Sequence, residues 1–166
     1  MRILGIDPGL NAIGYGVIDV ADQYRLNCVA AGVIRPSGKE LSARLLEIFE
    51  QVTAVLHEYI PDAMAVEDLY TTYEFPKTAV LMGHARGVIF LAAAARAVPV
   101  ISYAPTELKR AVTGHGRASK EQVQSMVQRL LRLAERPTPD HVSDALALAI
   151  CHAYRSRGLG IITETR

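Results

Sequence analysis

The stretch Ile3-Leu4-Gly5-Ile6-Asp7-Pro8-Gly9 decides the fold of this chain. Its apolar residues predict a short buried strand, and Pro8 ends that strand because proline has no N–H to donate to a neighbour. Two further strands are predicted at residues 12–20 and 24–35, which are rich in Val, Ile and Tyr and are separated by the polar residues 21–23. The chain therefore opens with three antiparallel strands.

Helices and strands alternate in the rest of the chain. Apolar residues recur at the helical period from Leu41 to Tyr59, and a strand at 63–66 follows and ends in Glu67. The remaining predicted elements are a helix at 77–97, a strand at 98–103, and helices at 105–112, 119–134 and from 138 past Tyr154. This order predicts an α/β fold with a central mixed five-stranded sheet, three antiparallel strands followed by two parallel ones, and helices on both faces.

Length and composition indicate one folded domain. The chain has 166 residues, of which 50% are hydrophobic and 21% charged, and these values exclude a disordered or low-complexity protein. We expect a single domain at 1–157 and a loose C-terminal tail at 158–166. The formal net charge is only +1, so any anionic partner must be held by local charge. Net charge alone neither supports nor excludes nucleic acid.

The cysteines and the apolar segments indicate a cytosolic protein. Cys28 and Cys151 lie far apart without metal-ligand spacing around them, so neither a disulfide framework nor a zinc site is indicated. Asp7 comes too early for the apolar region of a signal peptide. The most apolar stretch, 87–95, is too short to span a bilayer. We therefore expect a cytoplasmic protein without a membrane partner.

Two carboxylates follow buried strands. Asp7 ends the first predicted strand and Glu67 ends the fourth. Because α/β sheets hold ligands beyond the carboxyl ends of their strands, we expect these side chains to converge. Either carboxylate alone is also consistent with an ordinary loop cap at a strand end, and it is the pair that indicates a site.

The start of the last helix adds three more candidate ligands. Helical spacing puts Asp140, His141 and Asp144 on one face, although acidic residues also suit a helix start because they favour the macrodipole. Asp144 lies deeper, in an apolar run where an unpaired carboxylate is costly. Crowded carboxylates with one imidazole suit Mg²⁺ or Mn²⁺, and two such ions can activate water for phosphodiester hydrolysis.

Basic and aromatic residues provide candidate contacts to nucleic acid. Residues 105–136 carry a net charge of +4, which solvated helix faces explain in part. Lys109, Arg117 and Lys120 instead surround the loop at 114–116, as phosphate contacts beside a metal site do. The segment 69–75 holds three aromatic residues directly after Glu67, which either pack in the core or stack on bases.

Together these motifs resemble the RuvC family of bacterial Holliday junction resolvases, within the RNase H-like and retroviral integrase superfamily. The resemblance covers residues 2–155. It rests on five motifs: Leu4-Gly5-Ile6-Asp7-Pro8-Gly9 with Gly14-Tyr15-Gly16, Ala65-Val66-Glu67 followed by Tyr70, Gly83-His84-Ala85-Arg86-Gly87, Val112-Thr113-Gly114-His115-Gly116 with Lys120, and Asp144-Ala145-Leu146-Ala147. It implies an RNase H-like fold and a homodimer that nicks two strands of like polarity in a four-way DNA junction.

The resemblance also implies roles for individual residues. Asp7, Glu67 and Asp144 match catalytic acids of the family, Tyr70 matches its junction-facing aromatic residue, and Lys109 and Lys120 match its catalytic-loop lysines. Many members have a further aspartate three residues before the last one, where this chain has His141 with Asp140 beside it. Which of the two is the ligand stays open.

We therefore predict a crossover junction endodeoxyribonuclease that acts in recombination and repair and needs two Mg²⁺ or Mn²⁺ ions per site. The predicted catalytic and metal-binding residues are Asp7, Glu67, His141 and Asp144, with Asp140 as a further candidate ligand. The predicted DNA contacts are Tyr70, Lys77, Arg86, Lys109, Arg117 and Lys120. A branch-migration helicase complex is the partner that the resemblance implies. An RNase H-like hydrolase of RNA and a non-catalytic junction-binding module are the alternatives.

Overall fold

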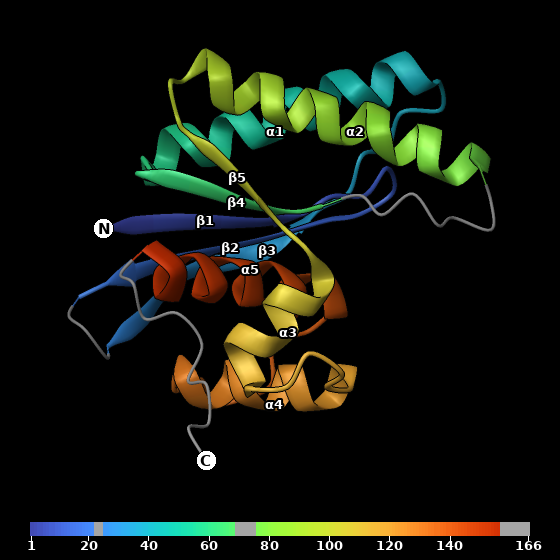
Figure 1. Ribbon diagram of the computed structural model, residues 1–166. Helices are drawn as coiled ribbons and strands as arrows, with labels where there is room; N and C mark the ends of the chain where they lie inside the picture. Colours follow the sequence, from blue (N-terminus) through green and yellow to red (C-terminus); the bar gives the residue numbers. More distant parts are fainter. Residues whose placement is uncertain (22–24, 69–75, 157–166) are drawn as a thin grey trace.

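One five-stranded mixed sheet forms the centre of the molecule. The computed structural model describes residues 1–21, 25–68 and 76–156, so the tail expected at 158–166 lies outside the described residues. The strand order is β3-β2-β1-β4-β5 (Figure 1). The strands are β1 (Arg2–Asp7), β2 (Ile13–Val20), β3 (Leu26–Ile34), β4 (Ala63–Glu67) and β5 (Val100–Tyr103).

Strand directions confirm the predicted sheet. β1 pairs antiparallel with β2 and β2 antiparallel with β3, whereas β4 runs parallel to both β1 and β5. Ile6 of β1 lies opposite Val66 of β4, one residue before Asp7 and Glu67. The two strand-end carboxylates therefore stand at the same edge of the sheet.

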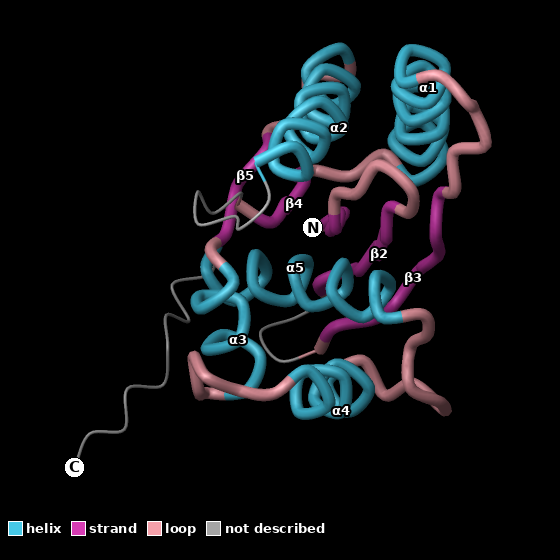
Figure 2. Tube along the Cα trace, turned by 90° about the vertical axis from the view of Figure 1, so that its right-hand side faces the viewer, coloured by secondary structure: helices cyan, strands magenta, loops and turns pink. Residues whose placement is uncertain are grey.

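Helices cover both faces of this sheet. α1 and α2 lie together on one face, while α5 lies against the other, with α3 and α4 packed beyond it (Figures 1 and 2). The helices are α1 (Leu41–Tyr59), α2 (Pro76–Ala95), α3 (Pro105–Thr113), α4 (Lys120–Leu130) and α5 (Asp140–Ser156). The predicted order of three strands and then alternating helices and strands is confirmed.

Alternation of side chains along β1 divides the core into two clusters. Ile3 packs in the cluster on the α5 side, whereas Leu4 and Ile6 pack in the cluster beneath α1 and α2, and all three are fully buried. Because side chains on a strand alternate between faces, Asp7 shares the α5 face with Ile3. In β4, Ala65 packs in the α5-side cluster, so Glu67 faces α5 as well.

Glycines in the sheet let α5 approach closely. A Cβ atom at Gly5 would stand 1.9 Å from the carbonyl oxygen of Ala145, and one at Gly14 would stand 1.9 Å from that of His141. No side chain fits in that space, so the helix rests directly on the backbone of β1 and β2. This contact sets the first turn of α5 beside the end of β1.

The structure corrects the predicted ends of α4 and α2, and α5 begins at Asp140 and not at 138. α4 was expected to reach Ala134, but it ends at Leu130, and Arg132 has a left-handed φ of 52°. Arg129 therefore lies in α4, whereas Arg132 and Arg136 lie beyond its end. α2 ends at Ala95 and not at 97, where Ala97 takes a left-handed φ of 54°. At its start α4 has the predicted capping box, in which the Ser119 N–H donates to Gln122 at 2.8 Å.

The apolar segment at 87–95 lies in the C-terminal half of α2, the helix predicted at 77–97. Over Lys77–Ala95, α2 is long and apolar enough to cross a membrane by length and composition, and only 22% of that window is buried within the chain. The helix packs on the sheet through buried Ala85, Ile89 and Ala92. On its outer side, Val80 and Leu91 are 60% and 59% exposed.

Candidate active site

The first turn of α5 meets the end of β1 through one short contact. Nδ1 of His141 lies 2.6 Å from Oδ2 of Asp7, within hydrogen-bonding distance. The Asp7 side chain is 12% exposed and the His141 side chain is 46% exposed. Two of the candidate ligands, Asp7 and His141, are thus brought together across 134 residues of chain.

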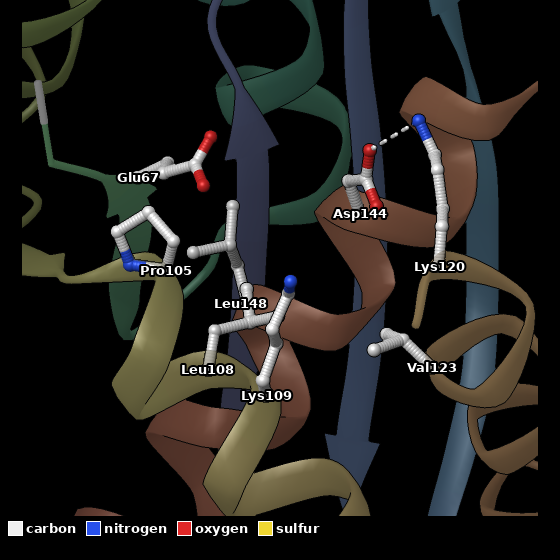
Figure 3. Close-up of a pocket in the computed structure, with 8 residues that line it drawn as sticks. All are labelled: Glu67, Pro105, Leu108, Lys109, Lys120, Val123, Asp144 and Leu148. Atoms are coloured by element: carbon white, nitrogen blue, oxygen red, sulfur yellow. Dashed lines mark ion pairs between the residues drawn. The ribbon is translucent and has the colours of Figure 1, made fainter. Parts of the chain in front are cut away.

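Glu67 and Asp144 line a pocket of about 280 Å³ between β4, α3, α4 and α5. Figure 3 shows Glu67 and Asp144 on opposite sides of this pocket, with Lys120 paired to Asp144. Lys109 enters the pocket from α3. Its apolar wall is formed by Pro105, Leu108, Val123 and Leu148.

Burial raises the pKa of all three carboxylates, and a neighbouring carboxylate adds to the shift of each. Burial raises the pKa of Glu67 to about 7, and the charges of Asp7 and Asp144 add to this effect. Burial also raises the pKa of Asp7, which the His141 hydrogen bond opposes and the Asp144 charge reinforces. Burial raises the pKa of Asp144 too, while Lys120 opposes the shift. Ionised carboxylates are therefore unfavourable here unless positive charge is supplied.

Lys120 supplies part of that charge. Its Nζ atom lies 3.0 Å from Oδ2 of Asp140 and 3.5 Å from Oδ2 of Asp144. Gln124 also donates to Asp140 at 2.9 Å. Asp140 is exposed, and Lys120 lowers its pKa. Asp140 thus faces α4, whereas His141 faces Asp7.

The donor set fits a divalent metal ion. Carboxylate oxygens with one imidazole are ligands that Mg²⁺ and Mn²⁺ accept, and their mutual repulsion favours a cation between them. Among the described residues, no three His, Cys, Asp or Glu side chains already stand close enough together to hold a metal ion. The candidate ligands of the described chain therefore do not form a closed coordination cage.

The structure separates the basic residues predicted to contact DNA. Lys109 and Lys120 line the carboxylate pocket, and Arg117 lines a neighbouring depression on the far side of α3. Lys77 is exposed at the start of α2, outside both of these pockets. Tyr70 lies outside the described residues.

Arg86 makes contacts within the chain that sequence reasoning missed. Its guanidinium donates to Oγ of Ser102 at 2.6 Å and to the carbonyl oxygen of Glu67 at 3.4 Å, and it stacks on Phe90 with Cζ 4.3 Å from the ring centroid. An ion pair with Asp68 at 3.3 Å adds to these contacts. Arg86 therefore ties α2 to the ends of β4 and β5. The feature of the sequence that could have indicated these contacts is a charged residue inside a predicted apolar helix.

Comparison with known proteins identifies the family. The family model described as crossover junction endodeoxyribonuclease RuvC matches residues 3–152. RuvC of Burkholderia vietnamiensis is 46% identical over 163 residues, covering 98% of this chain and 89% of that protein. RuvC of Thermotoga maritima is 44% identical over 165 residues, covering 99% and 97%.

Solved structures agree with this match. Thermus thermophilus RuvC in complex with a Holliday junction substrate superposes with a TM-score of 0.90 at 38% identity, covering 97% of this chain and 98% of that chain. The yeast mitochondrial Holliday junction resolvase Ydc2 shares the fold, with a TM-score of 0.68 at 15% identity over 95% of this chain and 79% of that chain. The predicted RNase H-like fold and the family resemblance are therefore confirmed. The chain belongs to the RuvC family of crossover junction endodeoxyribonucleases.

Proposed function

We propose that this chain resolves Holliday junctions by hydrolysing phosphodiester bonds in two strands of like polarity. The observation that carries the proposal is the convergence of Asp7, Glu67 and Asp144 at one sheet edge beside Lys109 and Lys120. A nuclease needs such an arrangement because carboxylates hold cations while lysines hold the phosphate. The name of the relatives and the junction bound in the Thermus complex support the choice of substrate.

In this mechanism Asp7, Glu67, Asp144 and His141 hold two divalent ions, Mg²⁺ or Mn²⁺, with Asp140 as the other candidate ligand. When bound, the ions activate water and stabilise the leaving oxygen. Lys109 orients the scissile phosphate from α3. Lys120, which pairs with Asp140 and Asp144, turns toward the phosphate once those carboxylates have other partners.

Further parts of the proposal concern binding and assembly. Tyr70 stacks on or wedges between bases at the crossover, while Lys77 and Arg117 contact phosphates.

Residues 1–157 act as one nuclease domain in a homodimer, which supplies one site per strand. A branch-migration helicase complex delivers the junction in the cytoplasm. The apolar outer side of α2 supports the dimer.

Nicking of a synthetic mobile four-way junction during a divalent-metal titration tests this function. We expect paired nicks that need Mg²⁺ or Mn²⁺ and stop in EDTA, while a linear duplex of the same sequence stays intact. Asp144→Asn should abolish nicking, and Glu50→Gln, which changes an exposed carboxylate on α1, should not. Cleavage of RNA in a hybrid with junctions left intact would favour an RNA hydrolase. Junction binding without nicking at any metal concentration would favour a non-catalytic module.

A further inference from the structure

A second basic depression lies on the other side of α3 from the carboxylate pocket. Its volume is about 490 Å³, and it is lined by Thr106, Arg110, Gly114, His115, Gly116 and Arg117. No acidic residue is in this lining. The lining is basic and open to solvent, which suits a charged polymer better than an enclosed small apolar ligand.

The two arginines of this depression have no acidic partner among residues 1–21, 25–68 and 76–156. Within the residues that the structure describes, neither Arg110 nor Arg117 makes an ion pair, whereas Arg2, Arg86 and Arg155 each do. Guanidinium groups bind phosphate oxygens through paired N–H donors, so two unpaired ones at one depression favour an anion there.

The loop between α3 and α4 is held in place before any ligand arrives. Oγ1 of Thr113 lies 2.8 Å from the carbonyl oxygen of Lys109, and it accepts a hydrogen bond from the His115 N–H at 3.2 Å. Gly114 takes a left-handed φ of 82° with nothing within 4 Å of where its Cβ would stand, so the loop surface is open there. Arg110 lies along Gly116, whose Cβ position is 3.7 Å from the guanidinium. The depression is therefore preorganised.

One helix forms the wall between the two pockets. Lys109 of α3 lines the carboxylate pocket, and Arg110, the next residue, lines the basic depression. A strand whose scissile phosphate lies at Lys109 would therefore need to cross only α3 for a neighbouring phosphate to reach Arg110 and Arg117. Resting on the proposed function, we propose that this depression is a second phosphodiester subsite, which holds a backbone phosphate next to the one being cut.

The subsite predicts a specific coupling between the arginines and one phosphate. Junctions are prepared with a single neutral methylphosphonate linkage, moved one position at a time along the strand through the crossover. Binding is measured in EDTA for the wild type and for the double variant Arg110→Gln/Arg117→Gln. At one position the neutral linkage should weaken the wild type about tenfold and leave the double variant unchanged.

The matched control is Arg129→Gln, which removes an exposed arginine from the last turn of α4. This control should bind the unmodified junction within about twofold of wild type. The double variant should bind it about tenfold more weakly, and the slope of its log binding constant against log salt concentration should be smaller by about 0.7–0.9. Equal effects of every neutral linkage on wild type and double variant would overturn the subsite.

Separate readouts distinguish the subsite from the proposed function. If the wild type nicks junctions normally but no neutral linkage is coupled to the two arginines, the subsite alone is overturned. Coupling without metal-dependent nicking overturns the proposed catalysis and supports the subsite. Failure of the wild type to bind DNA overturns both. Unchanged melting temperatures of the variants, which alter exposed side chains, exclude misfolding as the cause.

Discussion

Nδ1 of His141 and Oδ2 of Asp7 lie 2.6 Å apart and join the first turn of α5 to the end of β1. An ionised carboxylate can only accept hydrogen bonds, so in a neutral ring the proton lies on Nδ1 and the lone pair on Nε2. The contact therefore orients Asp7 and leaves His141 a free nitrogen for a cation. The equivalent contact is not made by Asp140, which faces Lys120.

Replacement of Asp7 by asparagine tests the central carboxylate. Asp7→Asn keeps the size of the side chain and removes its charge, so we expect nicking to fall at least about 10³-fold, since charge stabilisation by a metal ion contributes several kcal/mol. Junction affinity should stay within about threefold, because phosphate contacts elsewhere dominate binding. Single-turnover nicking and equilibrium binding on the same junction check both parts. Turnover at the wild-type rate would remove Asp7 from the mechanism.

His141 should set the metal preference. Because Mn²⁺ accepts a nitrogen ligand more readily than Mg²⁺ does, we expect faster nicking with Mn²⁺ at equal concentration. His141→Asp should shift the ratio toward Mg²⁺ by several-fold, as measured in parallel titrations. Asp140→Asn is the control and should retain the wild-type ratio. An inactive Asp140→Asn beside an active His141→Ala with an unchanged ratio would transfer the ligand role to Asp140.

The raised pKa of Glu67 makes stability depend on pH when no divalent metal is present. The folded chain holds the Glu67 proton up to a pKa of about 7, while the unfolded chain releases it near 4.5. The folded state thus binds more protons between these values, and stability falls as pH rises from about 4.5 to about 7. The shift corresponds to roughly 3 kcal/mol.

Thermal unfolding in EDTA at pH 5 and pH 8 measures this effect. The Glu67→Gln variant should be more stable than wild type at pH 8. Its melting temperature should differ much less between pH 5 and pH 8 than that of the wild type. Added Mg²⁺ should raise the melting temperature of wild type more at pH 8 than at pH 5. A wild type that is equally stable at both pH values in EDTA would contradict the proposed strain among the carboxylates.

Arg86 provides a test between two roles. Its contacts with Ser102 and with the carbonyl oxygen of Glu67 predict that it positions the end of β4. Arg86→Lys keeps the charge but loses the paired donors, so kcat should fall about tenfold while junction affinity and its salt dependence stay near wild type. A DNA contact, the role expected from sequence, predicts the opposite: Arg86→Gln would weaken binding and lower the salt slope.

The sheet and its two strand-end carboxylates were predictable from local sequence. Strand alternation fixes the face of Asp7 and Glu67, and parallel pairing brings their strand ends together. The orientation of His141 was not predictable in the same way, because it depends on how closely α5 rests on Gly14. That contact joins segments far apart in the chain.

The end of α4 shows a second limit of local patterns. Apolar residues continue at helical spacing through Leu133, yet the chain leaves the helix at Leu131 and Arg132 takes a left-handed φ of 52°. No glycine marks this turn, although glycine is the usual residue there. Leu131 at this end of the helix is buried in the α5-side core cluster, a tertiary contact that local spacing does not reveal.

The outer side of α2 predicts a dimer. Val80 and Leu91 are 60% and 59% exposed, and they line a mainly apolar groove with Leu45, Gly83, His84, Gly87 and Val88. A Cβ atom at Gly83 or Gly87 would meet nothing within 4 Å, so the surface has room for a second helix at close range. A second copy of the chain is the occupant we expect, since two nicks in one junction need two sites.

Charge on this groove should separate the two copies. Val80→Glu/Leu91→Glu places two carboxylates on each side of the interface, so sedimentation at micromolar concentration should change from dimer to monomer, with paired nicking reduced to single nicks. Val29→Glu is the matched control, because Val29 is 40% exposed on the edge strand β3 and does not line this groove. It should remain dimeric. A wild type that sediments as a monomer with and without junction DNA would contradict the interface, and the apolar side of α2 would then need another partner.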